Sequence, residues 1–349
     1  MFSTAPDSLC ILRLSAVGDI CHSLPVVRTI QSTWPNTQLS WIIGKSEASL
    51  IGDIPGITFI PFDKSGGLTA YRDLYKRLSR QKFDALLHMQ MSLRSSMVNR
   101  LIGTDVRIGF DRARAKDLQR WFNNHEIPAH KRQHVLDSFF GFSEALGIQE
   151  KLIKWDIPLP AIDIEKISQC LGDAAPYVVI SPCSAMAYRN WHCQGYAEVC
   201  DYITERGITP ILTGGPSTIE RTFGKRIAGL ARHPVKNLIG KTSLKQLLVV
   251  LKSAVGVISP DSGPAHMATT VHTPVIGLYA CTNPDRARPY LSKKYTVNKY
   301  DEAILAKYAK TVEQLPWGIR VKDPGTMDRI SVKDVTDKLD LLFTDQNLV

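Results

Sequence analysis

A turn near residue 260 has the residue types of an anion-binding site. Residues 255–258 are rich in valine and isoleucine and predict a buried strand. Asp261 and Gly263 follow in a turn, and Pro264 suits the first position of a helix because it lacks the N–H that would be unpaired there. The helix N-terminus would present free N–H groups to a phosphate, with His266 in its first turn.

Asp19 is a second candidate for chemistry. It follows Gly18 in a turn between a predicted strand at residues 9–14 and a predicted helix at 20–34. A carboxylate at the end of a strand could take a proton from a substrate hydroxyl as a general base. A helix N-cap is the alternative, since aspartate is common there.

A basic run covers residues 107–134. Its composition fits a solvated surface loop and an anion-binding site equally well. Its Lys and Arg residues are Arg107, Arg112, Arg114, Lys116, Arg120, Lys131 and Arg132.

The elements that must position these residues alternate between strand and helix. Such alternation predicts a parallel sheet covered on both faces, and the pattern occurs twice. We expect an N-terminal Rossmann-like domain at 1–155, a proline-containing linker at 156–175 and a second Rossmann-like domain at 176–325. The amphipathic pattern at 331–343 predicts a helix within 326–349 that packs back on the N-terminal domain.

Composition narrows the class of protein. The chain has 349 residues, of which 44% are hydrophobic, and a net charge of +10, which favours acidic or phosphorylated partners. The seven cysteines show no paired CxxC spacing, so we expect reduced thiols and no zinc site. We expect neither a signal peptide nor a membrane span. The lack of GxGxxG and GxxxxGK[ST] motifs counts against dinucleotide-binding and P-loop enzymes.

Several segments together resemble glycosyltransferase family 9, the ADP-heptose:lipopolysaccharide heptosyltransferases. They are residues 13–25, 189–191, 212–216, 259–266 and 277–279. The resemblance implies an α/β GT-B fold, with two Rossmann-like domains facing each other across a cleft, and an inverting transfer. It implies L-glycero-D-manno-heptose as the transferred sugar and ADP-heptose as the donor substrate, and, as the best match, the members that add the first heptose to Kdo of lipid A.

The resemblance also implies roles for individual residues, with no metal and no cofactor. The catalytic pair would be Asp19 as base and Arg189 as the cation that stabilises departing ADP. The donor-binding residues would be Ser184, Arg189, Glu220, Lys241, Thr242, Asp261, Ser262, Gly263 and His266. The acceptor-binding residues would be Gly18, Asp19, Gln90, Arg94, Arg112, Arg114 and Arg120.

Two positions depart from the family pattern. Ser262 stands where threonine is usual, which keeps the hydroxyl. The acidic residue expected close behind Gly-Gly-Pro is found only at Glu220, which weakens the prediction that it contacts the ribose. Asp261 would repel a diphosphate, so we expect it to orient His266 or a sugar hydroxyl.

The expected partners are ADP-L-glycero-D-manno-heptose, Kdo-lipid A and the cytoplasmic face of the inner membrane, to which the basic charge would hold a peripheral protein. Two alternatives stay open within the fold: a later core heptosyltransferase, or an enzyme that uses another nucleotide sugar. A nucleic-acid-binding protein is disfavoured, since aromatic residues make up 8% and no RNA-binding module is recognisable.

Overall fold

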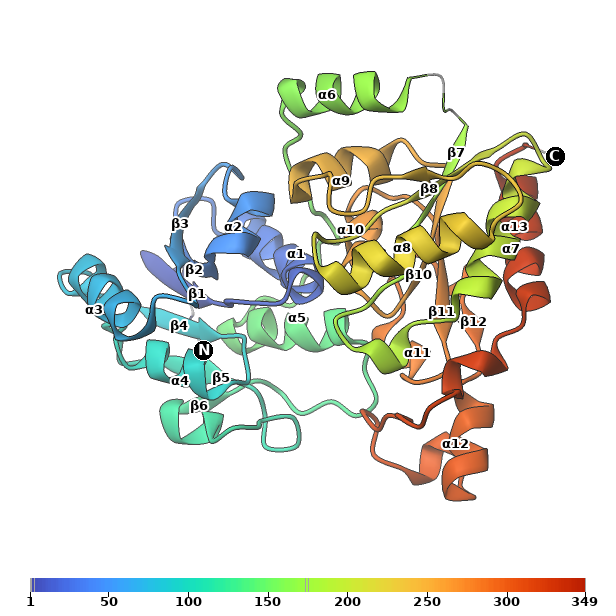
Figure 1. Ribbon diagram of the computed structural model, residues 1–349. Helices are drawn as coiled ribbons and strands as arrows, with labels where there is room; N and C mark the ends of the chain where they lie inside the picture. The colour runs from blue at the N-terminus through green and yellow to red at the C-terminus, as the bar shows by residue number, and fades with distance from the viewer. Residues whose placement is uncertain (1, 3, 173, 175, 349) are drawn as a thin grey trace. The chain divides into compact units, whose positions relative to one another are not determined.

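The computed structural model describes residues 2, 4–172, 174 and 176–348. The chain divides into two units, Met1–Pro158 and Leu159–Val349. Each contains a six-stranded sheet in which every pair of neighbouring strands is parallel (Figure 1). The predicted pair of Rossmann-like α/β domains is therefore present.

The first unit has the strand order β3-β2-β1-β4-β5-β6. Its strands are β1 (Ser8–Leu12), β2 (Gln38–Gly44), β3 (Ile57–Phe62), β4 (Ala85–His88), β5 (Arg107–Gly109) and β6 (His125–Glu126). Its helices are α1 (Val17–Thr33), α2 (Lys45–Ile51), α3 (Gly67–Leu78), α4 (Leu93–Asn99), the 3₁₀ helix η1 (Gln119–Phe122) and α5 (Val135–Leu146). Part of the basic run thus forms β5, η1 and β6.

The second unit has the order β12-β11-β10-β7-β8-β9. Its strands are β7 (Tyr177–Ile180), β8 (Thr209–Leu212), β9 (Lys236–Asn237), β10 (Gly256–Pro260), β11 (Val275–Tyr279) and β12 (Val297–Asn298). Its helices are α6 (Ala161–Leu171), η2 (Ala187–Arg189), α7 (Cys193–Thr204), α8 (Thr218–Leu230), α9 (Leu244–Lys252), α10 (Gly263–Thr270), α11 (Pro284–Ala287), η3 (Lys293–Tyr295), α12 (Tyr300–Tyr308), η4 (Val312–Gln314), η5 (Thr326–Arg329) and α13 (Val332–Asp345).

The structure departs from the predicted domain organisation at two helices. The expected linker at 156–175 contains α6, which lies in the second unit; Gln246 of α9 donates a hydrogen bond to Asp163 of α6 (3.2 Å). The apolar face of the last helix, α13, is buried within the second unit. Its residues Leu339 and Phe343 lie in the core of the second unit with Ile258 of β10. Helices α7 and α13 therefore pack in the same core.

Helix α1 contains Pro25, yet it continues without interruption. A proline inside a helix leaves the carbonyl four residues earlier, that of Cys21, without its usual N–H partner. Trp155 supplies the missing donor: its indole Nε1 donates to Cys21 O at 2.7 Å. Arg28 adds a second link, with Nε donating to Trp155 O (3.1 Å), so the end of the first unit is fastened along α1.

Replacing Trp155 by Phe should lower the free energy of unfolding, since the buried carbonyl of Cys21 loses its donor at a cost of about 1–3 kcal/mol. In a Pro25→Ala background residue 25 regains an N–H, so the same Trp155→Phe change should cost less. Urea denaturation of the four proteins measures the difference. Equal losses in the two backgrounds would contradict this account of the helix.

Candidate functional site

The strand order brings the predicted N-terminal site residues to one place in the first sheet. β1 lies between β2 and β4, so the chain leaves the neighbouring strands β1 and β4 toward opposite ends of the sheet. Ligand sites of open parallel sheets form beyond the carboxyl ends of such strands. Asp19 follows β1 in the first turn of α1, and Gln90 follows β4 after Met89, so both lie at this point.

Asp19 is not the N-cap of α1, which is Ala16; it occupies the third helical position. Its Oδ2 accepts a hydrogen bond from the Ala16 backbone N–H at 3.4 Å, so it contributes to the helix start. Its main partner is Arg13, whose Nη2 forms an ion pair with Oδ2. The Asp19 side chain is nevertheless 38% exposed, and its carboxylate can be reached from solvent. Gly18, before it, is buried in the first turn.

Gln90 uses its side chain inside the protein. Its Oε1 accepts the backbone N–H of Leu14 at 2.6 Å, and its Nε2 donates to Ser15 Oγ at 3.3 Å. Lys64 donates to Leu14 O (3.5 Å), and Trp41 Nε1 donates to Arg13 O (3.3 Å). Gln90 therefore holds the turn that precedes Asp19, a role that the sequence did not predict.

A buried polar network lies beneath the basic segment. His88, at the end of β4, has its Nε2 3.1 Å from Ser95 Oγ and its Nδ1 3.0 Å from Asn99 Nδ2. Burial lowers the pKa of His88 to about 4, which keeps the ring neutral at physiological pH. Gln119 of η1 donates to the His88 and Gln90 carbonyls (2.9 and 3.2 Å). η1 is thereby connected to the carboxyl end of β4.

The four arginines predicted to bind the acceptor differ in their partners. Arg114 forms an ion pair with Asp111 and donates to Pro128 O at 2.8 Å, so it braces the segment from within. Arg120 Nε lies 2.7 Å from Glu126 Oε1. Arg94 and Arg112 are exposed, and their guanidinium groups form no ion pair with a described residue. These two are available to bind an anion.

The second sheet repeats the arrangement. β10 and β7 are neighbours from which the chain leaves toward opposite ends of the sheet, and the loops that follow them carry the donor-site candidates. Helix α10 begins at Gly263 directly after the β10 turn. Its N-cap residue Ser262 gives no side-chain cap, because Ser262 Oγ lies 2.7 Å from Ser259 Oγ instead. The first-turn N–H groups are therefore not capped by that side chain.

Asp261 is the centre of a charged cluster. Arg189 Nη1 lies 3.1 Å from its Oδ2 and also donates to its carbonyl at 3.1 Å, and His266 Nε2 lies 3.7 Å from Oδ1. Burial alone would raise the pKa of Asp261, but His266, Arg189 and Thr282 outweigh it, and the pKa falls below its ordinary value. Asp261 is therefore an anion at neutral pH and offsets part of the Arg189 charge.

The remaining donor-site candidates lie around this cluster and at the neighbouring strand end. Ser184 Oγ donates to Asp261 O at 3.0 Å, which joins the β7 loop to the β10 turn. Glu220 Oε2 accepts the Gly215 N–H (2.6 Å), so this carboxylate holds the glycine turn after β8. Lys241 is exposed and donates to Asn237 O (2.8 Å), and Thr242 beside it is half-buried.

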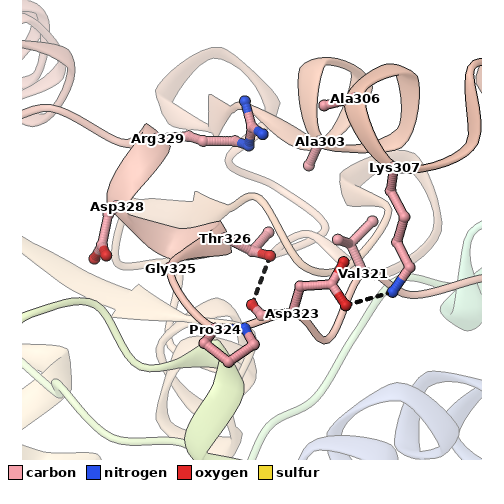
Figure 2. A pocket seen from close by; sticks show the side chains of 10 residues that line it. All are labelled: Ala303, Ala306, Lys307, Val321, Asp323, Pro324, Gly325, Thr326, Asp328 and Arg329. Atoms are coloured by element: carbon pink, nitrogen blue, oxygen red, sulfur yellow. Dashed lines mark hydrogen bonds and ion pairs between the residues drawn. The ribbon is translucent and has the colours of Figure 1, made fainter.

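A separate pocket of about 400 Å³ lies between α12 and the segment at 321–329 (Figure 2). Lys307 and Asp323 form an ion pair on its wall, at 2.6 Å. None of the predicted site residues lines it, so it is distinct from the candidate site. Within the described residues there is no cluster of three His, Cys, Asp or Glu side chains that could hold a metal ion. Nor does any helix among them have the length and apolarity to cross a bilayer.

Comparison with known proteins identifies the family. Residues 71–316 match the model of glycosyltransferase family 9 (heptosyltransferase). The lipopolysaccharide core heptosyltransferase OpsX of Haemophilus influenzae is 40% identical over 97% of this chain and 98% of its own. The chain therefore belongs to glycosyltransferase family 9 and is a heptosyltransferase-type glycosyltransferase.

More distant relatives test the finer predictions. Lipopolysaccharide heptosyltransferase 1 of Escherichia coli is 25% identical over 78% of this chain and 88% of its own, so the expected likeness to heptosyltransferase I is only distant, and OpsX is the more similar of the two. The E. coli heptosyltransferase WaaC, solved with ADP, superimposes with a TM-score of 0.72 at 21% identity over 96% of this chain and 99% of that one. This match confirms the GT-B fold.

Arg13 is not among the functional residues that the sequence predicts, although it lies in one of the segments that carry the family resemblance. A signal was available: an arginine interrupts an otherwise apolar strand sequence at 9–14, six residues before an aspartate. A charge at such a position is buried only with a partner.

Proposed function

We propose that this protein is an inverting glycosyltransferase that moves L-glycero-D-manno-heptose from ADP-heptose to Kdo of the lipid A inner core. The observation that carries the proposal is a solvent-accessible carboxylate, Asp19, beyond the carboxyl ends of β1 and β4 in the first sheet. Arg189 and the N-terminus of α10 lie at the corresponding place, beyond β7 and β10, in the second sheet. Two relatives support the substrate class: OpsX is a lipopolysaccharide core heptosyltransferase, and the heptosyltransferase WaaC was solved with ADP.

On the acceptor side, Asp19 acts as the general base. As the acceptor oxygen forms its bond to the anomeric carbon, its proton passes to the Asp19 carboxylate. The bond between the anomeric carbon and the diphosphate oxygen breaks on the opposite face, and ADP leaves with the electron pair. Attack from the face opposite the leaving group inverts the anomeric centre.

On the donor side, the diphosphate binds at the N-terminus of α10, where Gly263 lets the backbone approach closely. Arg189 stabilises the negative charge that develops on the departing ADP. Asp261 holds the guanidinium and His266 in place, and Ser184 and Ser262 order the surrounding turns. Glu220, Lys241 and Thr242 line the adenosine side.

The experiment that tests the proposal is incubation of the purified protein with ADP-heptose and Kdo-lipid A, followed by mass spectrometry. One added heptose is the expected product. A product formed only with an already heptosylated core would replace the proposal with a later core addition. A product formed only with another nucleotide sugar would replace the donor.

Asp19→Asn should lower kcat by about 10²- to 10⁴-fold, which corresponds to about 3–5 kcal/mol of transition-state stabilisation. The amide keeps the size of the side chain and can still lie beside Arg13, but it cannot take the proton. ADP binding measured by calorimetry should hardly change, because the ADP site is assigned to the second unit. A variant with near-normal kcat would leave Asp19 as a helix-start residue only.

Arg112→Ala should raise the KM for Kdo-lipid A several-fold and weaken its dependence on salt, since an exposed cation that binds an anionic group is screened by ions. The KM for ADP-heptose should not change. Arg114→Ala is the matched control: it should lower the melting temperature, since it breaks the Asp111 pair. A rise in the donor KM with Arg112→Ala would assign this arginine to the other substrate.

The proposed location is the cytoplasmic face of the inner membrane, where the protein is peripheral. In its support, Trp121 is 76% exposed and Leu118 55% exposed on the segment that also carries Arg112 and Lys116. Arg100, directly after α4, donates to Trp121 O (3.2 Å) and fixes the η1 backbone. An exposed tryptophan among basic residues suits the interface of an anionic bilayer.

The protein should float with vesicles that contain anionic phospholipid and not with purely zwitterionic ones. Trp121→Ser should reduce the bound fraction several-fold. Ile219→Ser, at a side chain that is 73% exposed on α8 of the second unit, should leave it unchanged. Unaltered flotation of the Trp121 variant would remove this residue from the membrane contact.

A further inference from the structure

Arg13 is a charged residue in an apolar setting. It directly follows β1, and its backbone N–H donates to Ile42 O at 3.1 Å, so it continues the sheet by one residue. Its side chain is only 8% exposed. Burial lowers the pKa of Arg13, and the nearby Asp19 carboxylate opposes that shift. Burying a cation costs folding free energy unless the cation is paired. A functional role would explain why an arginine occupies this position.

Three contacts fix the guanidinium group. Nη2 pairs with the Asp19 carboxylate, Nη1 donates to Met89 O at 2.5 Å, and Cζ lies 5.4 Å from the centre of the Phe139 ring. The third nitrogen, Nε, is buried and has no hydrogen-bond partner among the described residues. The group is therefore held by Met89, directly after β4, and by Phe139 of α5, and its ion-pair partner among the described residues is Asp19.

The anchor itself is rigid. Met89 lies between His88, which belongs to the buried polar network, and Gln90, which holds the backbone at Leu14 and the hydroxyl of Ser15. The Met89 backbone N–H also donates to Leu12 O (3.1 Å). The carbonyl that receives Nη1 thus cannot shift without disturbing the junction of β1 and β4.

We propose that Arg13 is a positioning residue that holds the Asp19 carboxylate in the orientation needed to accept the proton of the acceptor hydroxyl. This inference rests on the proposed role of Asp19 as the base. Arg13 touches no substrate; it acts through Asp19. A carboxylate on the first turn of a helix would otherwise sample several rotamers, and only a fixed one presents its free oxygen reproducibly.

The test compares Arg13→Met and Arg13→Lys with Arg28→Met. Methionine fills the space over Phe139 without charge, and kcat should fall by about 10- to 100-fold while the KM for ADP-heptose stays within about twofold, because misplacing a reacting group costs rates of that order. Lysine keeps the charge but cannot donate to Asp19 and Met89 in a guanidinium's fixed geometry, so kcat should recover only in part. Arg28, which donates to main-chain carbonyls near Trp155, is the control arginine and should leave kcat unchanged.

The decisive measurement adds Arg13→Met to an Asp19→Asn background. If Arg13 acts through Asp19, the second substitution should lower kcat no further. The same fold-loss in both backgrounds, or an Arg13→Lys enzyme with full kcat, would overturn the inference. Normal kcat for Asp19→Asn alone would instead remove Asp19 as the base, which separates failure of the proposed function from failure of this inference. ADP calorimetry and thermal unfolding confirm that each variant is folded.

Discussion

Parallel strand pairing is the constraint on which both candidate sites depend. Side chains that follow two neighbouring parallel strands must emerge at the same edge of the sheet. Where the chain leaves those strands in opposite directions, no connection covers that edge. In the first unit this edge receives Asp19 and Gln90, and in the second it receives Arg189 and Asp261. Residues far apart in sequence are thereby grouped at one edge of each sheet.

Each unit stabilises a largely buried arginine with the same kinds of contact. Each has an arginine that is largely buried, has one carboxylate partner and leaves its Nε without a hydrogen bond: Arg13 with Asp19, and Arg189 with Asp261. In each case a main-chain carbonyl takes a further N–H, from Met89 or from Asp261 itself. Fixed ion pairs of this kind keep charged groups oriented in a partly dry environment, which catalysis by charge stabilisation requires.

The sequence was enough to predict most strands and the paired α/β units, since these depend on local patterns. It failed where the outcome depends on partners distant in sequence. Helix α6 buries only Ile167 and lies between prolines and glycines, so its pattern resembled a linker. The amphipathic pattern of α13 predicted that one face is buried, but it did not identify the surface against which that face packs. Arg112 and Arg114 look alike in sequence, and only the positions of Asp111 and Pro128 distinguish them.

The pairing of Pro25 with Trp155 has a consequence for how the first unit is made. During synthesis, α1 emerges from the ribosome long before Trp155, and until then the carbonyl of Cys21 has only water as a partner. The helix that carries Asp19 is therefore completed by almost the last residue of its unit. A nascent chain that stops short of this tryptophan would hold an unfinished helix, so native packing of α1 should arise late and together with the closing segment of the unit.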